Sequence, residues 1–190
     1  MDQKENNKKL KLSFTQIDDY LTCPLLYKFR YILKIKTPKS AAPSFGQVIH
    51  ETLQNFFELV LQKKKADKKT LLELYENNWK PEGYKDKIDE LSYKKKGEEQ
   101  LSHYYDRYEE FPVTPMMVEK TFVFMLDDIR ITGKIDRIDN AGGNKINIID
   151  YKTGKGRSQS DVDKSLQMSI YAAAAEELFP GKEVQYLNFL

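Results

Sequence analysis

Apolar and polar residues alternate in two stretches of this 190-residue chain that are separated by five turn-forming residues. The first stretch runs from Gly133 to Asp139 and the second from Lys145 to Lys152, with Asn-Ala-Gly-Gly-Asn between them. Alternation with period two is typical of a half-buried strand, and a connection rich in glycine and asparagine is typical of a hairpin turn. The pattern therefore predicts a β-hairpin between Gly133 and Lys152.

Further strands and helices follow from the same kind of pattern. Alternation predicts strands at Val118–Phe124, Ile129–Ile138 and Glu183–Leu190, and helical spacing of apolar residues predicts helices elsewhere. The expected helices are a short one from Ser13 or Thr15 to Cys23-Pro24, a helical turn at Leu25–Ile32, and longer ones at Ser44–Lys65, Lys69–Trp79, Asp86–Glu109 and from Asp161 or Asp163 to Leu178. Three successive strands, a helix and a last strand favour an α/β fold with a mixed central sheet flanked by helices.

Length and composition suit one domain. A chain of 190 residues with 40% hydrophobic content can bury a single core, which we expect over residues 12–190 with a helical insertion at about 66–110. Met1–Lys11 is polar and rich in lysine, and we expect it to be a flexible lead. It does not resemble a signal peptide, and the sequence holds no apolar run of membrane-spanning length. We therefore expect a cytoplasmic protein with no membrane partner.

Charge and cysteine content exclude some classes of site. The formal net charge of +2 does not by itself indicate a nucleic-acid partner. The single cysteine, Cys23, excludes an intramolecular disulfide and a zinc cluster of cysteines alone. Lys28 and Arg30 flank the aromatic residues of the second helical turn, where they would contact a nucleic-acid backbone or, as we favour, extend over a hydrophobic core. The lysine runs, such as Lys63–Lys65, are expected to be solvated helix ends rather than phosphate-binding patches.

The predicted hairpin carries two aspartates and a lysine. Symmetric pairing about Gly143 would place Asp136 opposite Asp150, about 5 Å apart at Cβ, and would put Lys152 on the same face as Asp150. Two adjacent carboxylates repel unless a cation lies between them, and a hard divalent ion is the usual occupant. A slip of one residue in register would separate the aspartates onto opposite faces. The hairpin therefore predicts a metal site with a lysine beside it.

This set of residues suits the hydrolysis of a phosphodiester. A divalent ion lowers the pKa of water and polarises a phosphate, and Lys152 can orient the attacking water or stabilise the developing charge. His50 would complete the coordination sphere and the Tyr151 carbonyl would add an oxygen, although a lone histidine is more often structural. The sequence lacks the residues of a Walker phosphate loop, a calcium loop or a nucleophilic triad.

A wider set of motifs surrounds the hairpin. They are Leu12-Ser13-Phe14-Thr15-Gln16-Ile17 with Cys23-Pro24, Gly46 with His50, Glu119, Gly133-Lys134-Ile135-Asp136-Arg137, Asp150-Tyr151-Lys152-Thr153-Gly154, and Gln167 with Tyr171. In order and spacing these motifs resemble the PD-(D/E)XK nuclease superfamily. Within it they resemble the RecB-type nuclease domain, which is often the C-terminal domain of UvrD-like DNA helicases. The resemblance spans about residues 12 to 190.

The resemblance implies a restriction-endonuclease-like core and a role for each matching residue. His50, Asp136, Asp150 and the Tyr151 carbonyl would bind Mg²⁺ or Mn²⁺, and Lys152 would be the catalytic lysine. Gln167 and Tyr171 would position that lysine and the DNA, and Glu119 and Arg137 would support the site. The implied activity is that of a metal-dependent deoxyribonuclease acting on DNA ends or single strands and coupled to a helicase in recombination or repair.

The sequence departs from some members of that branch, which hold an iron–sulfur cluster on four cysteines. One of the four lies at the position of Cys23, and this sequence has no other cysteine, so we expect Cys23 to be a small buried hydrophobe. Helicase motifs are missing, so the chain is a free-standing nuclease or, as we expect, a domain excised from a larger protein. Two alternatives stay open. One is a DNA-binding or partner-docking module without useful turnover, and the other is a structural α/β protein whose hairpin carries a surface salt bridge.

Overall fold

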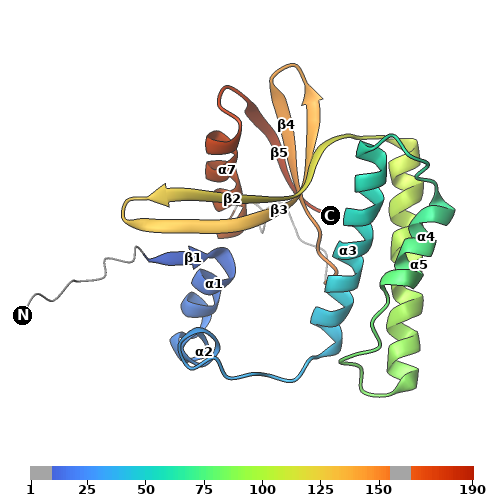
Figure 1. Ribbon diagram of the computed structural model, residues 1–190, viewed down its shortest axis with the longest axis horizontal. Helices are drawn as coiled ribbons and strands as arrows, with labels where there is room; N and C mark the ends of the chain where they lie inside the picture. The colour runs from blue at the N-terminus through green and yellow to red at the C-terminus, as the bar shows by residue number, and fades with distance from the viewer. Residues whose placement is uncertain (1–9, 155–163) are drawn as a thin grey trace, which may run out of the picture.

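A computed structural model of the chain describes residues 10–154 and 164–190 (Figure 1). In this part of the chain five strands form one mixed sheet: β1 (Lys11–Ser13), β2 (Thr114–Leu126), β3 (Ile129–Gly142), β4 (Lys145–Asp150) and β5 (Glu183–Phe189). The long strand β3 pairs with β2 and β4 in antiparallel fashion and with β1 in parallel, and β5 runs parallel to β4. The predicted α/β class with a mixed sheet is confirmed.

Helices surround this sheet. They are α1 (Phe14–Thr22), α2 (Pro24–Tyr27), the π-helical turn η1 (Lys28–Ile32), α3 (Ala41–Leu61), α4 (Lys68–Asn78), α5 (Lys87–Glu110) and α7 (Leu166–Leu178). Ser13 caps α1 in a reciprocal capping box with Gln16, because each side chain bonds the other residue's backbone N–H. Asp86 caps α5 by accepting from the N–H groups of Ile88 and Asp89.

The sequence predicts Ser44 as the N-cap of the long helix α3, but the cap is Ser40, so the helix begins four residues earlier, at Ala41. Pro43 therefore lies in its first turn. The N–H groups of a first turn have no acceptor within the helix, so a proline is tolerated there. Strand β1 is absent from the sequence-based expectation because it has only three residues, and its pairing with Arg130–Thr132 defines it.

Two hydrophobic cores lie on opposite faces of the sheet. Side chains alternate along β4, so Ile146 and Ile148 pack in the core with α7, whereas Ile149 packs in the core of α3, α4 and α5. Figure 1 shows α3, α4 and α5 standing together on one side and α7 on the other. The helices of the expected insertion, α4 and α5, thus share one core with α3 and with the end of β4.

Some expectations about burial are wrong. Cys23 is exposed rather than buried, and it joins α1 to α2 in an extended conformation with φ −162° and ψ 108°. Leu25, Phe29 and Ile32 are also exposed, at 52%, 41% and 62%, so the cations beside them do not cover a core. Helical spacing predicts that Leu166 points inward, yet 40% of it is exposed at the start of α7.

Two further expectations concern residues at the edge of the described ranges. The flexible lead at Met1–Lys11 lies mostly within residues 1–9, which are outside the description, as are Asp161 and Asp163. The helix expected to start at one of those aspartates is described from Leu166, with Ser165 as its cap. Among the described residues, no helix combines the length and the apolar character needed to cross a bilayer.

Candidate active site

Asp136 and Asp150 lie at the end of the β3–β4 ladder. The register places Arg137 opposite Ile149. Asp136, one residue before Arg137, therefore comes opposite Asp150, one residue after Ile149. This is the symmetric register about Gly143 that the sequence predicts. Both side chains are buried, with 8% of Asp136 and 2% of Asp150 exposed. Burial, followed by the nearby Asp136 carboxylate, raises the pKa of Asp150 above its ordinary value.

Two residues of α7 and one lysine hold the Asp150 carboxylate. The Gln167 amide donates to Asp150 Oδ1 at 2.7 Å, and the Tyr171 hydroxyl lies 3.0 Å from the same oxygen. Lys152 Nζ lies 2.5 Å from Asp150 Oδ2 and donates to Gln167 Oε1 at 2.9 Å. One amide therefore binds a carboxylate through its NH₂ and an ammonium through its oxygen, which fixes both groups. Gln167 and Tyr171 share one helix face, as their spacing of four residues predicts.

His50 reaches the same region from α3. Its Nδ1 lies 3.4 Å from Asp136 Oδ2, and its Nε2 lies 2.8 Å from the Tyr151 carbonyl oxygen. A carbonyl only accepts, so Nε2–H donates to it and the neutral ring turns the lone pair of Nδ1 toward Asp136. Burial alone would lower the pKa of His50, but the Asp136 carboxylate and the Tyr151 carbonyl outweigh it and raise the pKa above 6.5.

Glu119 completes a group of three side chains that could hold a metal ion. It lies in β2 between Val118 and Lys120, which pair with Arg137 and Ile135, and so it comes opposite Asp136. One ligand atom from each of His50, Glu119 and Asp136 lies within 4.8 Å of the other two. Glu119 has a left-handed backbone with φ +51°, a conformation that costs a residue with a side chain about 1–3 kcal/mol. Such strained residues are concentrated at functional sites.

This donor set fits a divalent cation. Two carboxylates and one imidazole offer the hard oxygen and nitrogen donors that suit Mg²⁺ and Mn²⁺. A metal-binding histidine usually donates its second ring N–H to a carbonyl or a carboxylate, and His50 does so toward Tyr151. The sequence indicates only a supporting role for Glu119, whereas the geometry places its carboxylate beside those of the expected ligands. Asp150 is not one of these three residues, and its carboxylate contacts Lys152, Gln167 and Tyr171 instead. The Tyr151 carbonyl, also expected as a ligand, lies against His50 Nε2.

Tyr151 links the site to a buried arginine. Its backbone N–H donates to Asp136 Oδ2 at 2.8 Å, and its ring hydroxyl accepts from Arg137 Nη1 at 2.8 Å. Arg137 also contacts the Tyr104 hydroxyl, pairs with Asp139 and lies with its guanidinium 4.2 Å from the centre of the Phe57 ring. Arg137 therefore contacts the site through Tyr151, whose backbone N–H holds Asp136.

A cleft of about 510 Å³ opens at Lys152. It lies between α1 and the start of α7. Its lining consists of Phe14, Asp18, Leu21, Lys152, Lys164, Ser165, Leu166, Gln167 and Phe189. Lys152 Nζ lies 5.0 Å from the centre of the Phe189 ring. The catalytic lysine expected from the sequence is thus accessible from solvent.

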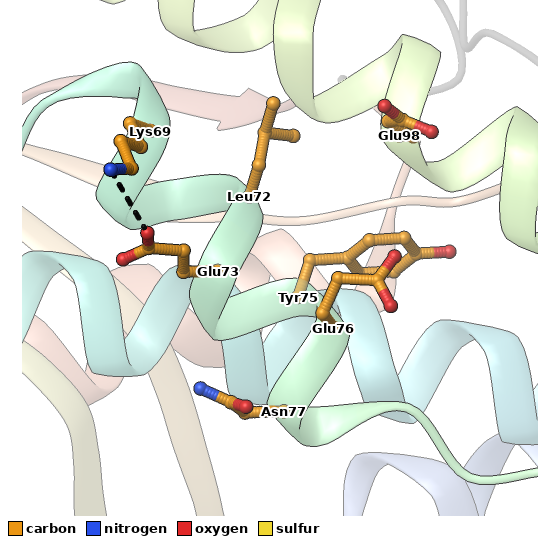
Figure 2. A pocket seen from close by; sticks show the side chains of 7 residues that line it. All are labelled: Lys69, Leu72, Glu73, Tyr75, Glu76, Asn77 and Glu98. Atoms are coloured by element: carbon orange, nitrogen blue, oxygen red, sulfur yellow. Dashed lines mark ion pairs between the residues drawn. The ribbon is translucent and has the colours of Figure 1, made fainter.

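A larger hollow of about 670 Å³ lies elsewhere, between α4 and α5. Figure 2 shows its lining, in which Glu73, Glu76 and Glu98 supply three carboxylates and Lys69 pairs with Glu73. It holds none of the residues singled out from the sequence. A polyanionic substrate would be repelled by these carboxylates, so the site chemistry belongs to the cleft at Lys152.

One charged residue of this region, Lys134, belongs to the Gly133–Arg137 motif but was given no role from the sequence. Lys134 forms an ion pair with Glu119, and its side chain is half exposed. It comes two residues before Asp136 on β3, so period two already places the two side chains on one face. The partner Glu119 could not be read from the sequence, because it comes from a different strand.

Comparisons with known proteins point to a family of nucleases. The profile of the PD-(D/E)XK nuclease superfamily matches residues 11–189. A subunit of the ATP-dependent helicase/deoxyribonuclease of Clostridium perfringens strain SM101 is 27% identical over 210 residues, covering 87% of this chain and 17% of the relative. The corresponding subunits from strains ATCC 13124 and 13 are 26% identical over the same shares. The chain thus spans about a sixth of the length of these relatives.

Proposed function

This chain belongs to the PD-(D/E)XK nuclease superfamily, and we propose that it hydrolyses phosphodiester bonds of DNA with the help of Mg²⁺ or Mn²⁺. The observation that carries the proposal is the convergence of three ligating side chains, His50, Glu119 and Asp136, beside the Asp150–Gln167–Lys152 contacts. A cation site next to a fixed ammonium group is what the hydrolysis of an anionic ester requires.

The cation and the protein have separate tasks. When bound to His50, Glu119 and Asp136, a divalent ion would supply a Lewis acid that polarises the phosphate and makes water more acidic. Lys152 donates hydrogen bonds from a position fixed by Asp150 and Gln167, so it can orient water and stabilise charge on the phosphoryl oxygens. The Tyr151 backbone keeps Asp136 and His50 in register, because its N–H binds one and its carbonyl binds the other.

The substrate we propose is a DNA end or single strand delivered by a helicase. The relatives in Clostridium perfringens carry both helicase and deoxyribonuclease in their names, and this chain corresponds to a small share of their length. A helicase partner, in the same polypeptide or another, therefore fits a chain whose motifs concern only the nuclease.

Cleavage of end-labelled DNA tests the proposal. Single- and double-stranded DNA are incubated with Mn²⁺, Mg²⁺ or chelator, with wild type beside Asp136→Asn and Lys152→Ala. Asp128→Asn is the matched control, because Asp128 is an exposed aspartate in the turn before β3. We expect cleavage that requires the metal, is lost in both site variants and is kept in the control. Intact DNA binding without cleavage under any metal would instead indicate a DNA-binding or partner-docking module.

A further inference from the structure

The segment that precedes α3 is unusually apolar and unusually basic on its exposed surface. Between Tyr20 and His50 the sequence has five cations, Lys28, Arg30, Lys34, Lys36 and Lys39, and no acidic residue. Arg30 pairs with Asp19 and Lys39 with Glu82, whereas Lys28, Lys34 and Lys36 have no ion pair within the described ranges. This segment therefore presents uncompensated positive charge in a chain that is nearly neutral overall.

A row of tyrosine rings crosses the same segment. The Tyr20 ring lies 5.6 Å from the Tyr27 ring, and the Tyr27 ring lies 5.1 Å from the Tyr31 ring. Tyr20 is 54% exposed, and Phe29 is 41% exposed on the turn between Tyr27 and Tyr31. Tyr27 and Tyr31 are half-buried, whereas the lysines of this segment are exposed. We call the surface of this segment the basic aromatic face; its residues are Tyr20, Tyr27, Phe29, Tyr31, Lys28, Lys34 and Lys36.

The basic aromatic face continues into the cleft of the candidate active site. Leu21 is 69% exposed and lines that cleft together with Lys152 and Gln167, and its chain neighbour Tyr20 begins the row of rings. The face and the cleft therefore meet at Tyr20 and Leu21 on α1.

We propose that the basic aromatic face binds the single strand of DNA that leads to the cleft at Lys152. The proposal rests on the proposed function, because it names the path of that substrate. Exposed rings interleaved with cations are how proteins hold single-stranded nucleic acid, with bases stacked on the rings and phosphates beside the cations. A duplex buries the faces of its bases, so the rings favour a single strand. Charge complementarity and continuity with the cleft both favour a polyanion over a protein partner.

Binding in the presence of chelator tests the face without cleavage. The probe is a fluorescein-labelled oligothymidylate of about 15 nucleotides, a length within the site sizes known for single-strand binders. Lys34→Glu/Lys36→Glu is compared with Lys63→Glu/Lys64→Glu, an exposed pair of lysines just after α3. We expect weaker binding only in the first pair. Each phosphate contact with a single strand contributes about 0.7 to the slope of log K against log salt concentration, so the loss of two contacts should make that slope smaller by about 1.4.

The stacking contribution has its own matched control. Tyr20→Ser is compared with Tyr186→Ser, because these tyrosines are 54% and 57% exposed and Tyr186 lies on β5. We expect Tyr20→Ser to weaken binding of the single strand by about tenfold, within the range of one base stack, and Tyr186→Ser to leave it unchanged. The proposal would be overturned if the two lysine-pair variants and the two tyrosine variants all bound the single strand as tightly as wild type. It would also be overturned if a control variant lost as much affinity as the face variant it is matched to.

A small substrate separates this proposal from the proposed function. Hydrolysis of bis(p-nitrophenyl) phosphate with Mn²⁺ needs the metal site, but this substrate is too short to reach the basic aromatic face. We expect the face variants to keep this activity while they lose affinity for the oligothymidylate. Unchanged oligothymidylate binding by the face variants, with hydrolysis intact, would refute the role of the face alone. Absence of metal-dependent hydrolysis in wild type would instead refute the proposed function.

Discussion

Replacement of Arg137 by methionine is expected to destabilise the fold strongly. Arg137 is only 2% exposed and makes two short contacts to Asp139, at 2.8 and 2.9 Å, and Asp139 is itself 2% exposed. Removing one partner of a buried ion pair leaves an uncompensated charge, which costs about 3–5 kcal/mol. The methionine side chain fills similar space, so most of this loss comes from the stranded carboxylate rather than from a cavity.

The double variant Arg137→Met/Asp139→Leu separates charge from packing. Because no charge is left buried, we expect it to recover most of the stability, and replacing a buried pair by apolar residues is often close to neutral. Urea unfolding at pH 7 measures both variants. Breaking a buried pair is expected to cost several kcal/mol, so a loss below about 1 kcal/mol in the single variant would show that the pair contributes little. Equal losses in the single and double variants would show that the unpaired Asp139 carboxylate is not the cause.

The pH dependence of the single variant gives an independent check. Burial raises the pKa of Asp139 above 3.8, and Arg137 is the group that opposes this rise. Without Arg137 the pKa rises further. A carboxyl whose pKa is higher in the folded state costs no stability below its unfolded pKa. The cost then grows as the pH rises from the unfolded pKa through the folded pKa. The gap in unfolding free energy between wild type and Arg137→Met should therefore be small near pH 4 and widen toward pH 7.

Two other variants probe the site and the helical layer. Gln167→Leu removes the amide that binds Asp150 and Lys152, and we expect cleavage to fall about 10–100-fold while Mn²⁺ still binds, as single-turnover cleavage and a metal titration would reveal. Gly97→Ala would place a Cβ 2.1 Å from the Tyr75 hydroxyl. The cost of overpacking, about 1–3 kcal/mol, should exceed the gain in helix propensity of about 1 kcal/mol, so thermal unfolding should show a lower Tm. An unchanged Tm would mean that Tyr75 moves aside.

The hairpin and its chemistry could be predicted from the sequence because they depend on local pattern. Period two and a central turn fix the register of β3 against β4, and that register alone brings Asp136 and Asp150 together. The contact between Gln167 and Tyr171 is also local, since residues four apart share a helix face.

The remaining parts of the site depend on tertiary packing. His50 meets Asp136 only because α3 packs against the end of β4, and a lone histidine in a helix carries no sign of that. The place of Glu119 depends on a left-handed backbone within β2, which its residue type does not indicate. The apolar residues of α2 and η1 illustrate the opposite error, because helical spacing predicts an apolar stripe but cannot say whether anything covers it.

Direct measurement of metal binding tests the central claim, that His50, Glu119 and Asp136 hold one divalent cation. Electron paramagnetic resonance of free Mn²⁺ during a titration counts the bound ions. We expect one bound Mn²⁺ in wild type and in Asp128→Asn. We expect a loss of affinity of about 10-fold or more in Asp136→Asn and Glu119→Gln, because each removes a charged ligand. Equal Mn²⁺ affinity in wild type and both ligand variants would show that these residues do not hold the cation.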